Sequence, residues 1–128
     1  MKVTKTTPIL CVASIEESLP FWTKILGYEK TIEVPHGGKL GFVILQKNES
    51  EIMLQTHPSM VDDLPEVAKH IKVGSICLYS EVDSLDKTLL ALKTVKPLVP
   101  PRTTSYGAKE VFVRDPDGNV LGFAEHQK

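Results

Sequence analysis

The chain has 128 residues, of which 41% are hydrophobic, and a formal net charge of -1. This length fits one domain that buries roughly two thirds of its unfolded surface. Its basic and acidic residues form no long run of one sign, which excludes the charge pattern of a nucleic-acid-binding or membrane-surface protein. No run reaches the ~18 apolar residues of a membrane span, and the first residues lack the pattern of a secretory signal. We therefore expect a cytoplasmic protein that binds neither nucleic acid nor membrane.

The two cysteines, Cys11 and Cys77, lie within apolar runs that are typical of strands. They show no CxxC spacing and have no neighbouring histidine. Such residues pack as small hydrophobic side chains when they are reduced. We expect both to be reduced core residues and not a disulfide or zinc ligands.

The first predicted elements are a strand and a helix. The run PILCVA, residues 8–13, has the length of a buried strand. In the following segment, SIEESLPFWTKILG, Ser14 and Glu17 have the spacing of a capping box, and Gly27 stands where a helix stops. Pro20 lies inside this segment and predicts a kink, because proline has no N–H to donate.

The same order of elements then occurs twice. Three strand-like runs follow the first helix, YEKTIEVP, LGFVILQ and SEIMLQTH, and the polar connector at 58–71 is expected to be helical. Next come a strand, VGSICLYS, a helix, EVDSLDKTLLALK, an edge strand, KPLVPP, and two further strands, AKEVFVRD and NVLGFAEH. The sequence therefore predicts an α+β fold, a single domain over 1–128 with two βαβββ units at about 6–57 and 72–126.

The internal repeat also predicts the role of the acidic turn DPDG. An offset of 69 residues lays 42–57 on 111–126 without a gap, so that the turn KNE coincides with PDG. Because the counterpart is not an acidic run, we interpret DPDG as structural. A three-residue loop would pair Phe112 with Gly122 and Glu110 with Ala124 on the two strands of this hairpin.

The paired βαβββ pattern, together with LPFWTKILGY and RDPDGNVLGFAE, resembles the vicinal oxygen chelate superfamily. This superfamily contains glyoxalase I, bleomycin-resistance proteins and extradiol dioxygenases, and the resemblance spans essentially the whole chain. It implies that the sheets of the two units pair into a curved trough, with the helices outside and the active site inside. Bleomycin-resistance proteins are homodimers, so the resemblance also implies a homodimer. It specifies the activity poorly, because one scaffold hosts many functions.

Metal-dependent members of the superfamily line the trough with four ligands, on the first and last strands of each unit. By register these places fall on Thr7, Met53, Gly74 and Gly122. None of the four offers the imidazole, carboxylate or carboxamide that such metals prefer. We therefore expect no metal and no other cofactor, and we assign no catalytic residue.

Strand alternation predicts which side chains would face the trough. If Met53 faces it, so do Gln55 and His57, although His57 lies ~13 Å along the strand from the usual reaction centre. Glu110 either contacts a ligand or forms a rim pair with a lysine, and the loop PPRTTSYGAKE either covers the pocket or is merely exposed. The candidate ligand-binding residues are Thr7, Met53, Gln55, His57, Arg102, Tyr106, Glu110, Phe112 and Gly122.

These observations favour a metal-free protein that binds an apolar or mildly cationic small molecule and sequesters a drug or metabolite. One alternative is an enzyme, a glyoxalase-like lyase, an isomerase or a dioxygenase, with a divalent metal on Gln55, His57 and Glu110. Another is a dimeric interaction module in which Phe112 and Met53 fill a collapsed pocket. Metal content and ligand binding distinguish the three.

Overall fold

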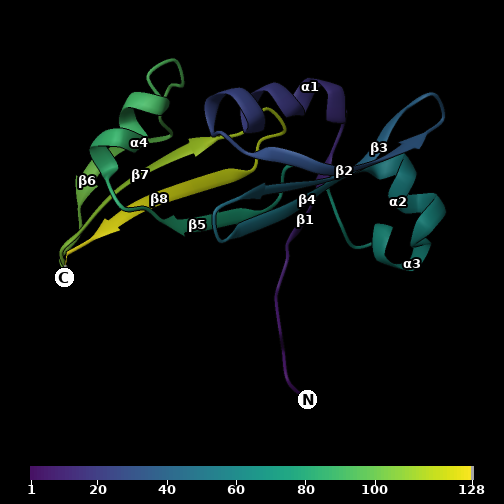
Figure 1. Ribbon diagram of the computed structural model, residues 1–128, viewed down its shortest axis with the longest axis horizontal. Coiled ribbons are helices and arrows are strands. Elements are labelled where there is room, and N and C mark those ends of the chain that lie inside the picture. The colour runs from purple at the N-terminus through teal and green to yellow at the C-terminus, as the bar shows by residue number, and fades with distance from the viewer. Residues whose placement is uncertain (128) are drawn as a thin grey trace. The chain divides into compact units, whose positions relative to one another are not determined.

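Each half of the chain folds as a strand, a helical segment and three further strands (Figure 1). The computed structural model describes residues 1–127, and the chain divides into two compact units, unit 1 (Met1–Gly74) and unit 2 (Ser75–Lys128). Unit 1 contains β1 (Ile9–Val12), α1 (Ile15–Pro20), the π-helix η1 (Phe21–Ile25), β2 (Glu29–His36), β3 (Lys39–Lys47), β4 (Ser50–Thr56), α2 (His57–Asp63) and α3 (Pro65–Ala68). Unit 2 contains β5 (Cys77–Glu81), α4 (Leu85–Ala91), β6 (Val99–Thr103), β7 (Ala108–Arg114) and β8 (Val120–His126). The predicted α+β class and its two βαβββ units are confirmed.

The first helical segment begins and ends where its sequence predicts. The Ser14 side chain accepts a hydrogen bond from the Glu17 N–H at 3.3 Å, which caps α1. Pro20 is the last residue of α1, and the chain continues from there as η1. A proline removes one backbone donor, and the hydrogen-bond pattern changes at this point from the α to the π spacing. Gly27 then ends the segment with φ at +79°.

Unit 1 has the strand order β1-β4-β3-β2, with β1 parallel to β4 and the other pairs antiparallel. One face of β1, β3 and β4 is buried, and α1 packs against β3 and β4, whereas the edge strand β2 contributes no buried residue. The side chains buried on this face occupy alternate positions of their strands. They are Leu10, Val12, Val43, Leu45, Ile52 and Leu54 from the strands, with Ile15 and Trp22 from the helical segment.

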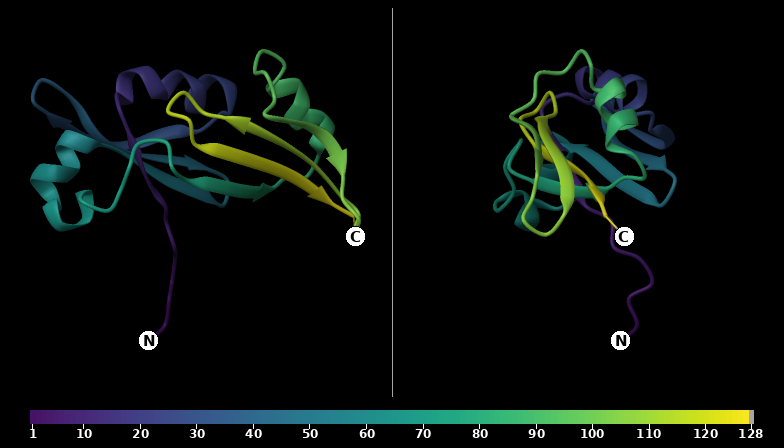
Figure 2. Two further views of the ribbon diagram at one scale, coloured as in Figure 1. Left: turned by 180° about the vertical axis from the view of Figure 1, so that it is seen from behind. Right: turned by 90° about the vertical axis from the view of Figure 1, so that its left-hand side faces the viewer.

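Unit 2 repeats this arrangement with the order β5-β8-β7-β6. Here α4 lies over one face of its own sheet (Figure 2). The predicted hairpin register is confirmed, because Phe112 pairs with Gly122 and Glu110 with Ala124. The proline-containing strand β6 lies at the edge of the sheet, where its missing N–H costs no ladder bond.

The turn between β7 and β8 is held by hydrogen bonds within the hairpin. The Asp115 carboxylate accepts from the backbone N–H of Asn119 at 2.8 Å, from its side-chain amide at 2.9 Å and from the Asp117 N–H at 3.0 Å. The side-chain amide oxygen Oδ1 of Asn119 in turn accepts from the Ile76 N–H at 3.2 Å, just before β5. Gly118 has φ at +97°, which favours glycine. The acidic turn therefore has the structural role that the repeat predicted.

Three residues lie in surroundings that differ from the sequence-based expectation. Cys77 is exposed, so the prediction that it is a core residue is wrong, whereas Cys11 is buried; neither forms a disulfide. His57 begins α2 and does not continue β4, because the Thr56 side chain caps that helix and a proline follows in its first turn. Gly74 lies in a turn with φ at +72°, before β5 begins.

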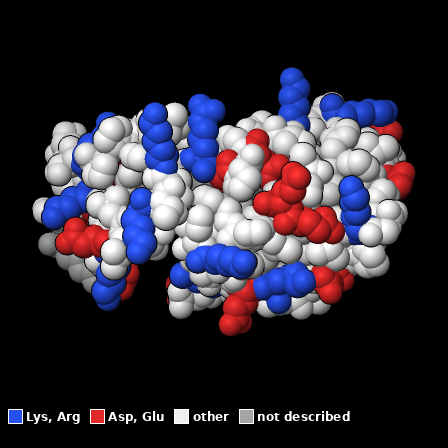
Figure 3. Space-filling model, turned by 90° about the horizontal axis from the view of Figure 1, so that it is seen from above, with Lys and Arg blue, Asp and Glu red and all other residues white. Residues whose placement is uncertain are grey.

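The surface carries both signs of charge. On the face drawn in Figure 3, lysine and arginine side chains are interspersed with aspartate and glutamate. This agrees with a net charge of -1 and no long run of either sign. No helix among residues 1–127 has the length and apolar character needed to cross a membrane.

Candidate functional site

The uncovered face of the unit 2 sheet contains small residues in its central strand. On β8, Gly122 lies between Tyr79 of β5 and Phe112 of β7 in the cross-strand register. A β-carbon added to Gly122 would lie 2.5 Å from Cε2 of Phe112, closer than any non-bonded contact allows. The Phe112 ring therefore covers the backbone of Gly122. This is the placement that the predicted hairpin register required.

Four rings gather on this face, and we call them the aromatic cluster: Tyr79, Tyr106, Phe112 and His126. The ring centroid of Tyr79 lies 6.2 Å from that of Phe112 and 6.2 Å from that of His126, and the Tyr106 and His126 centroids are also 6.2 Å apart. The tilted and edge-on geometries are those that aromatic quadrupoles favour. Tyr79 and Tyr106 remain exposed, so the cluster offers aromatic surface to the solvent.

A buried carboxylate lies beside the aromatic cluster. Glu110 is only 1% exposed, and its neighbour across the hairpin is the small Ala124. One Glu110 oxygen lies 3.5 Å from Nη2 of Arg102 and accepts a hydrogen bond of 3.4 Å from the Tyr106 hydroxyl. The structure thus brings together three of the predicted residues, Arg102, Tyr106 and Glu110. The charge partner of Glu110 is an arginine from the edge strand and not the lysine that was considered.

The surroundings of Tyr79 keep its hydroxyl protonated. Desolvation is the largest cause, followed by a hydrogen bond with Tyr106 and the negative charge of Glu110, and together they raise the pKa of Tyr79 to about 12. At neutral pH this phenol is therefore a neutral hydrogen-bonding group. It offers no phenolate base for catalysis.

The uncovered face of the unit 1 sheet is mostly apolar in its middle. In the cross-strand register, Met53 lies between Ile9 and Ile44, and Ile32 extends the same row on β2. Ile9 is 39% exposed and Ile32 is 50% exposed. Met53 therefore belongs to an apolar row that α1 does not cover, as strand alternation predicted.

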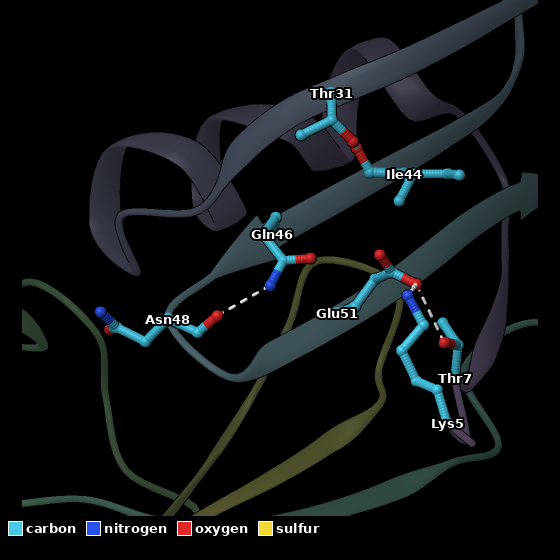
Figure 4. A network of polar contacts seen from close by, with 7 residues as sticks. All are labelled: Lys5, Thr7, Thr31, Ile44, Gln46, Asn48 and Glu51. Atoms are coloured by element: carbon cyan, nitrogen blue, oxygen red, sulfur yellow. Dashed lines mark hydrogen bonds and ion pairs between the residues drawn. The ribbon is translucent and has the colours of Figure 1, made fainter. Parts of the chain in front are cut away.

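At one end of this face a carboxylate ties the N-terminal segment to β4 (Figure 4). Glu51 accepts a hydrogen bond of 3.0 Å from the Thr7 hydroxyl and lies 2.9 Å from the Lys5 ammonium. These two contacts, with Lys5 the larger cause, hold the pKa of Glu51 below its ordinary value. The Thr7 hydroxyl is thus already engaged in a contact within unit 1.

At the other end of this face, beside α2, unit 1 contains a hollow with a volume of about 400 Å³. Its lining residues come from the β2–β3 hairpin, from β4 and from α2: Val34, Pro35, His36, Phe42, Gln55, Ser59, Asp62 and Asp63. The predicted residue Gln55 is among them and is 4% exposed. His57 is not among them, and its Nε2 lies 3.3 Å from the Ala68 carbonyl oxygen of α3.

Of the four places that the superfamily resemblance predicted for metal ligands, the structure corrects one. Ile9 pairs with Met53 and Tyr79 with Gly122, so the counterpart of Thr7 in unit 2 is Cys77 and not Gly74, which lies in the turn before β5. The Thr7 hydroxyl donates to Glu51, Met53 offers a soft thioether, and Gly122 has no side chain. A glutamate in place of Gly122 would also displace the Phe112 ring. Within residues 1–127 no group of three or more His, Cys, Asp or Glu side chains is close enough to hold a metal ion.

Sequence reasoning missed two parts of these surfaces. Tyr79 was not singled out, although a strand parallel to β8 places it beside Gly122. His36 was not among the predicted site residues, yet its Nε2 lies 2.7 Å from the Asp62 carboxylate. These two residues are 26 positions apart and belong to different elements, so no local pattern joins them.

Comparisons with known proteins agree with this fold. The family model described as "Glyoxalase/Bleomycin resistance protein/Dioxygenase superfamily" matches residues 4–123. No curated protein shows significant sequence similarity to the chain.

Among similar solved structures is a glyoxalase/bleomycin resistance protein/dioxygenase from Nocardioides, 18% identical with a TM-score of 0.78, over 100% of this chain and 86% of that one. Another is TnmS3, an antibiotic-binding protein from a Streptomyces species, 20% identical with a TM-score of 0.75, over 99% of each chain. A third is lactoylglutathione lyase from Agrobacterium tumefaciens, 16% identical with a TM-score of 0.77, over 98% of this chain and 96% of that one. At these identities the likeness shows the fold.

Proposed function

The chain belongs to the Glyoxalase/Bleomycin resistance protein/Dioxygenase superfamily, and on that premise we propose that it is a small-molecule-binding protein that works without the metal of the superfamily's enzymes. Its role would be to hold, and so sequester, a drug or metabolite. The observation that carries this proposal is the Phe112 ring, which covers Gly122 where a metal-binding member would present a carboxylate. An aromatic side chain at this place favours binding by contact over catalysis by a metal.

The aromatic cluster indicates the kind of ligand. Its exposed rings would stack on a flat apolar or aromatic body, and such contacts are worth about 0.5–1.5 kcal/mol per ring pair beyond the buried area. Glu110 already has Arg102 as its charge partner, which offsets part of its negative charge. A mildly cationic group is compatible with Glu110, but the binding energy would come mainly from the rings. The antibiotic-binding protein TnmS3, with the same fold, supports this type of function.

The protein would act in the cytoplasm as a homodimer, as the bleomycin-resistance proteins that it resembles do. A monomeric mass in light scattering at micromolar concentration contradicts the dimer.

Equilibrium dialysis against bleomycin and a panel of aromatic antibiotics tests the binding function. We expect at least one saturable ligand, with affinity reduced at least about tenfold by Phe112→Ala and by Tyr79→Ala, since each removes a ring with its buried area. The matched control is Leu90→Ala, which removes an exposed apolar side chain from α4. Equal losses in all three variants contradict a specific role for the rings.

Metal analysis of protein purified without a tag tests the metal-free part of the proposal. Stoichiometric, tightly held zinc, nickel or iron would contradict it. If the dimer forms but no probe of the panel binds, the chain is better described as an interaction module in which Phe112 fills the former site.

A further inference from the structure

One imidazole nitrogen of the aromatic cluster lies between a phenol and a carboxylate. His126 is the last residue of β8, and its Nε2 lies 3.4 Å from the Tyr79 hydroxyl and 3.9 Å from Oε1 of Glu81. Both partners belong to β5, which runs parallel beside β8. The His126 side chain is 39% exposed, so its ring can exchange protons with the solvent.

Two phenol hydroxyls connect this imidazole with the buried carboxylate of Glu110. The Tyr106 hydroxyl donates to Oε1 of Glu110 at 3.4 Å, and Tyr79 shares a hydrogen bond with Tyr106. A phenol has one proton to donate. Because Tyr106 donates to Glu110, it can only accept from Tyr79. Tyr79 then has no proton left, so His126 donates to it through Nε2.

The direction of this hydrogen-bonded chain sets what protonation of His126 changes. Nε2 carries a proton in the neutral ring, and acid adds the second proton at Nδ1. The hydrogen bond to Tyr79 is therefore present in both states, and only the charge differs. An imidazole ordinarily changes its charge between about pH 5 and pH 8. Acid thus adds one positive charge to the aromatic cluster while the rings keep their places.

The groups around His126 do not cancel this charge. Within residues 1–127 they are Tyr79 and Glu81 on β5, Tyr106 in the loop before β7, Glu110 on β7 and its partner Arg102 on β6. Tyr79 stays neutral, because desolvation and its neighbours raise its pKa to about 12. Glu81 is 72% exposed, so solvent screens its attraction and it offsets a protonated imidazole only in part.

We propose that His126 makes the aromatic cluster responsive to pH, so that an aromatic cation binds while the imidazole is neutral and binds more weakly once it is protonated. This inference rests on the proposed function and adds a ligand class and its regulation. Aromatic ring faces attract a cation. The ring centroid of His126 lies 6.2 Å from those of Tyr79 and Tyr106, so a cation held on these rings is repelled by a charged imidazole. At an exposed site this repulsion lowers the affinity about threefold.

Amide chemical-shift titration with benzyltrimethylammonium tests the inference, because this cation keeps its charge at every pH. The uncharged probe of nearly the same shape is 2-methyl-1-phenylpropan-2-ol. From pH 8 to pH 5.5 the cation should lose about threefold in affinity, whereas the affinity of the alcohol should stay the same. The shifted amides should lie on β5, β7 and β8. An equal loss for the two probes, or no loss for the cation, would overturn the proposal.

The imidazole of His126 provides a second readout. Binding and protonation are linked reciprocally, so a threefold loss of affinity requires that a saturating cation move the midpoint of the His126 titration about 0.5 pH unit lower. Imidazole proton–nitrogen spectra follow this midpoint. The same spectra should place the proton of the neutral ring on Nε2 in the free protein. A neutral ring with its proton on Nδ1, or a midpoint that does not respond to the cation, contradicts the inference.

The variant His126→Gln separates charge from hydrogen bonding, because the amide can still donate to Tyr79 but does not titrate. At pH 8 it should bind the cation about as well as wild type, and the loss at pH 5.5 should disappear. The matched control is His70→Gln, at an exposed histidine that follows α3 in unit 1; it should keep the wild-type pH dependence. If His126→Gln keeps that dependence as well, another group causes it and the proposal is wrong.

Failure of this inference can be told from failure of the proposed function. Binding of the cation with the same affinity at both pH values overturns the inference alone. So does a panel antibiotic that binds the aromatic cluster when the cation does not. If neither the antibiotics nor the two probes bind at pH 8, the proposed function fails and the inference fails with it.

Discussion

Phe112 and Gly122 face each other across the β7–β8 hairpin, and the phenyl ring occupies the space that any side chain at position 122 would need. The ring can lie there only because the neighbouring strand has no β-carbon at that point. The contact therefore depends on glycine at position 122.

Replacing Gly122 by alanine should therefore destabilise the protein. The new methyl group forces Phe112 out of its position, and overpacking of this kind costs about 1–3 kcal/mol. Gly122 has no positive φ in this structure, so backbone strain does not contribute to the cost. Urea denaturation of the wild type and of Gly122→Ala measures the loss of unfolding free energy. The denaturant slopes of the two unfolding curves should be compared.

The double variant with Phe112→Leu provides the control. Leucine leaves room beside position 122. The loss of unfolding free energy caused by Gly122→Ala should therefore be at least about 1 kcal/mol smaller in the Phe112→Leu background, because residues in contact are energetically coupled. Equal costs in the two backgrounds would mean that the ring does not occupy this space in solution.

Arg102→Ala should leave the Glu110 carboxylate without its charge partner. Breaking a fully buried pair costs about 3–5 kcal/mol, but Arg102 is largely exposed and we expect a loss of about 1–2 kcal/mol. The same change in a Glu110→Gln background should cost less, because no charge is then left unpaired. Chemical denaturation at neutral pH measures both. If Arg102→Ala costs the same in both backgrounds, the ion pair does not contribute.

The contact between Glu51 and the N-terminal segment predicts a pH dependence of stability. Its folded-state pKa is lowered from the ordinary 4.5 by Lys5 and Thr7. As the pH falls, the unfolded chain takes up the proton first, so this stabilisation is present above about pH 4.5 and is lost as the pH drops through the lowered pKa. The melting temperature of the wild type should therefore be higher than that of Glu51→Gln at pH 7, and the difference should shrink as the pH falls.

The control for this titration is Glu49→Gln, a change at an exposed glutamate in the neighbouring turn. It should follow the wild-type pH dependence. A difference between wild type and Glu51→Gln that stays constant down to pH 3 would contradict the assignment.

Asp115→Ala should destabilise the β7–β8 hairpin strongly. The change removes the acceptor of three N–H groups, two of them on the fully buried Asn119, and each buried donor left unpaired costs about 1–3 kcal/mol. Thermal unfolding measures the effect. Glu49→Ala, in the turn that the repeat places on this one, is the control and should be nearly neutral. A neutral Asp115→Ala would mean that the turn holds its shape without the carboxylate.

Part of this fold follows from local patterns. The cap at Ser14, the stop at Gly27 and the turn at Asp115 depend on residues within a few positions of one another, and each has the predicted role. The three-residue loop then predicted that Phe112 pairs with Gly122, because a hairpin with a given loop length has one register. Strand alternation likewise placed Met53 and Gln55 on one face.

Other features depend on where a strand yields to a helix. His57 has the apolar-polar alternation of β4, but the cap at Thr56 and the proline that follows His57 turn the chain into α2.

Cys77 has apolar neighbours in sequence, yet β5 is an edge strand and the Cys77 side chain is exposed. Alternation alone specifies the relative faces of a strand's residues and does not say which of them another element will cover.

The sequence by itself determined the α+β repeat and the hairpin register, because each is a matter of residue identity at fixed spacing. Only the tertiary structure decided that Arg102 and Tyr106 contact Glu110, and that His36 and Asp62 meet across the hollow of unit 1. These contacts join separate elements, and their distances depend on how helices and strands pack, which no local pattern contains.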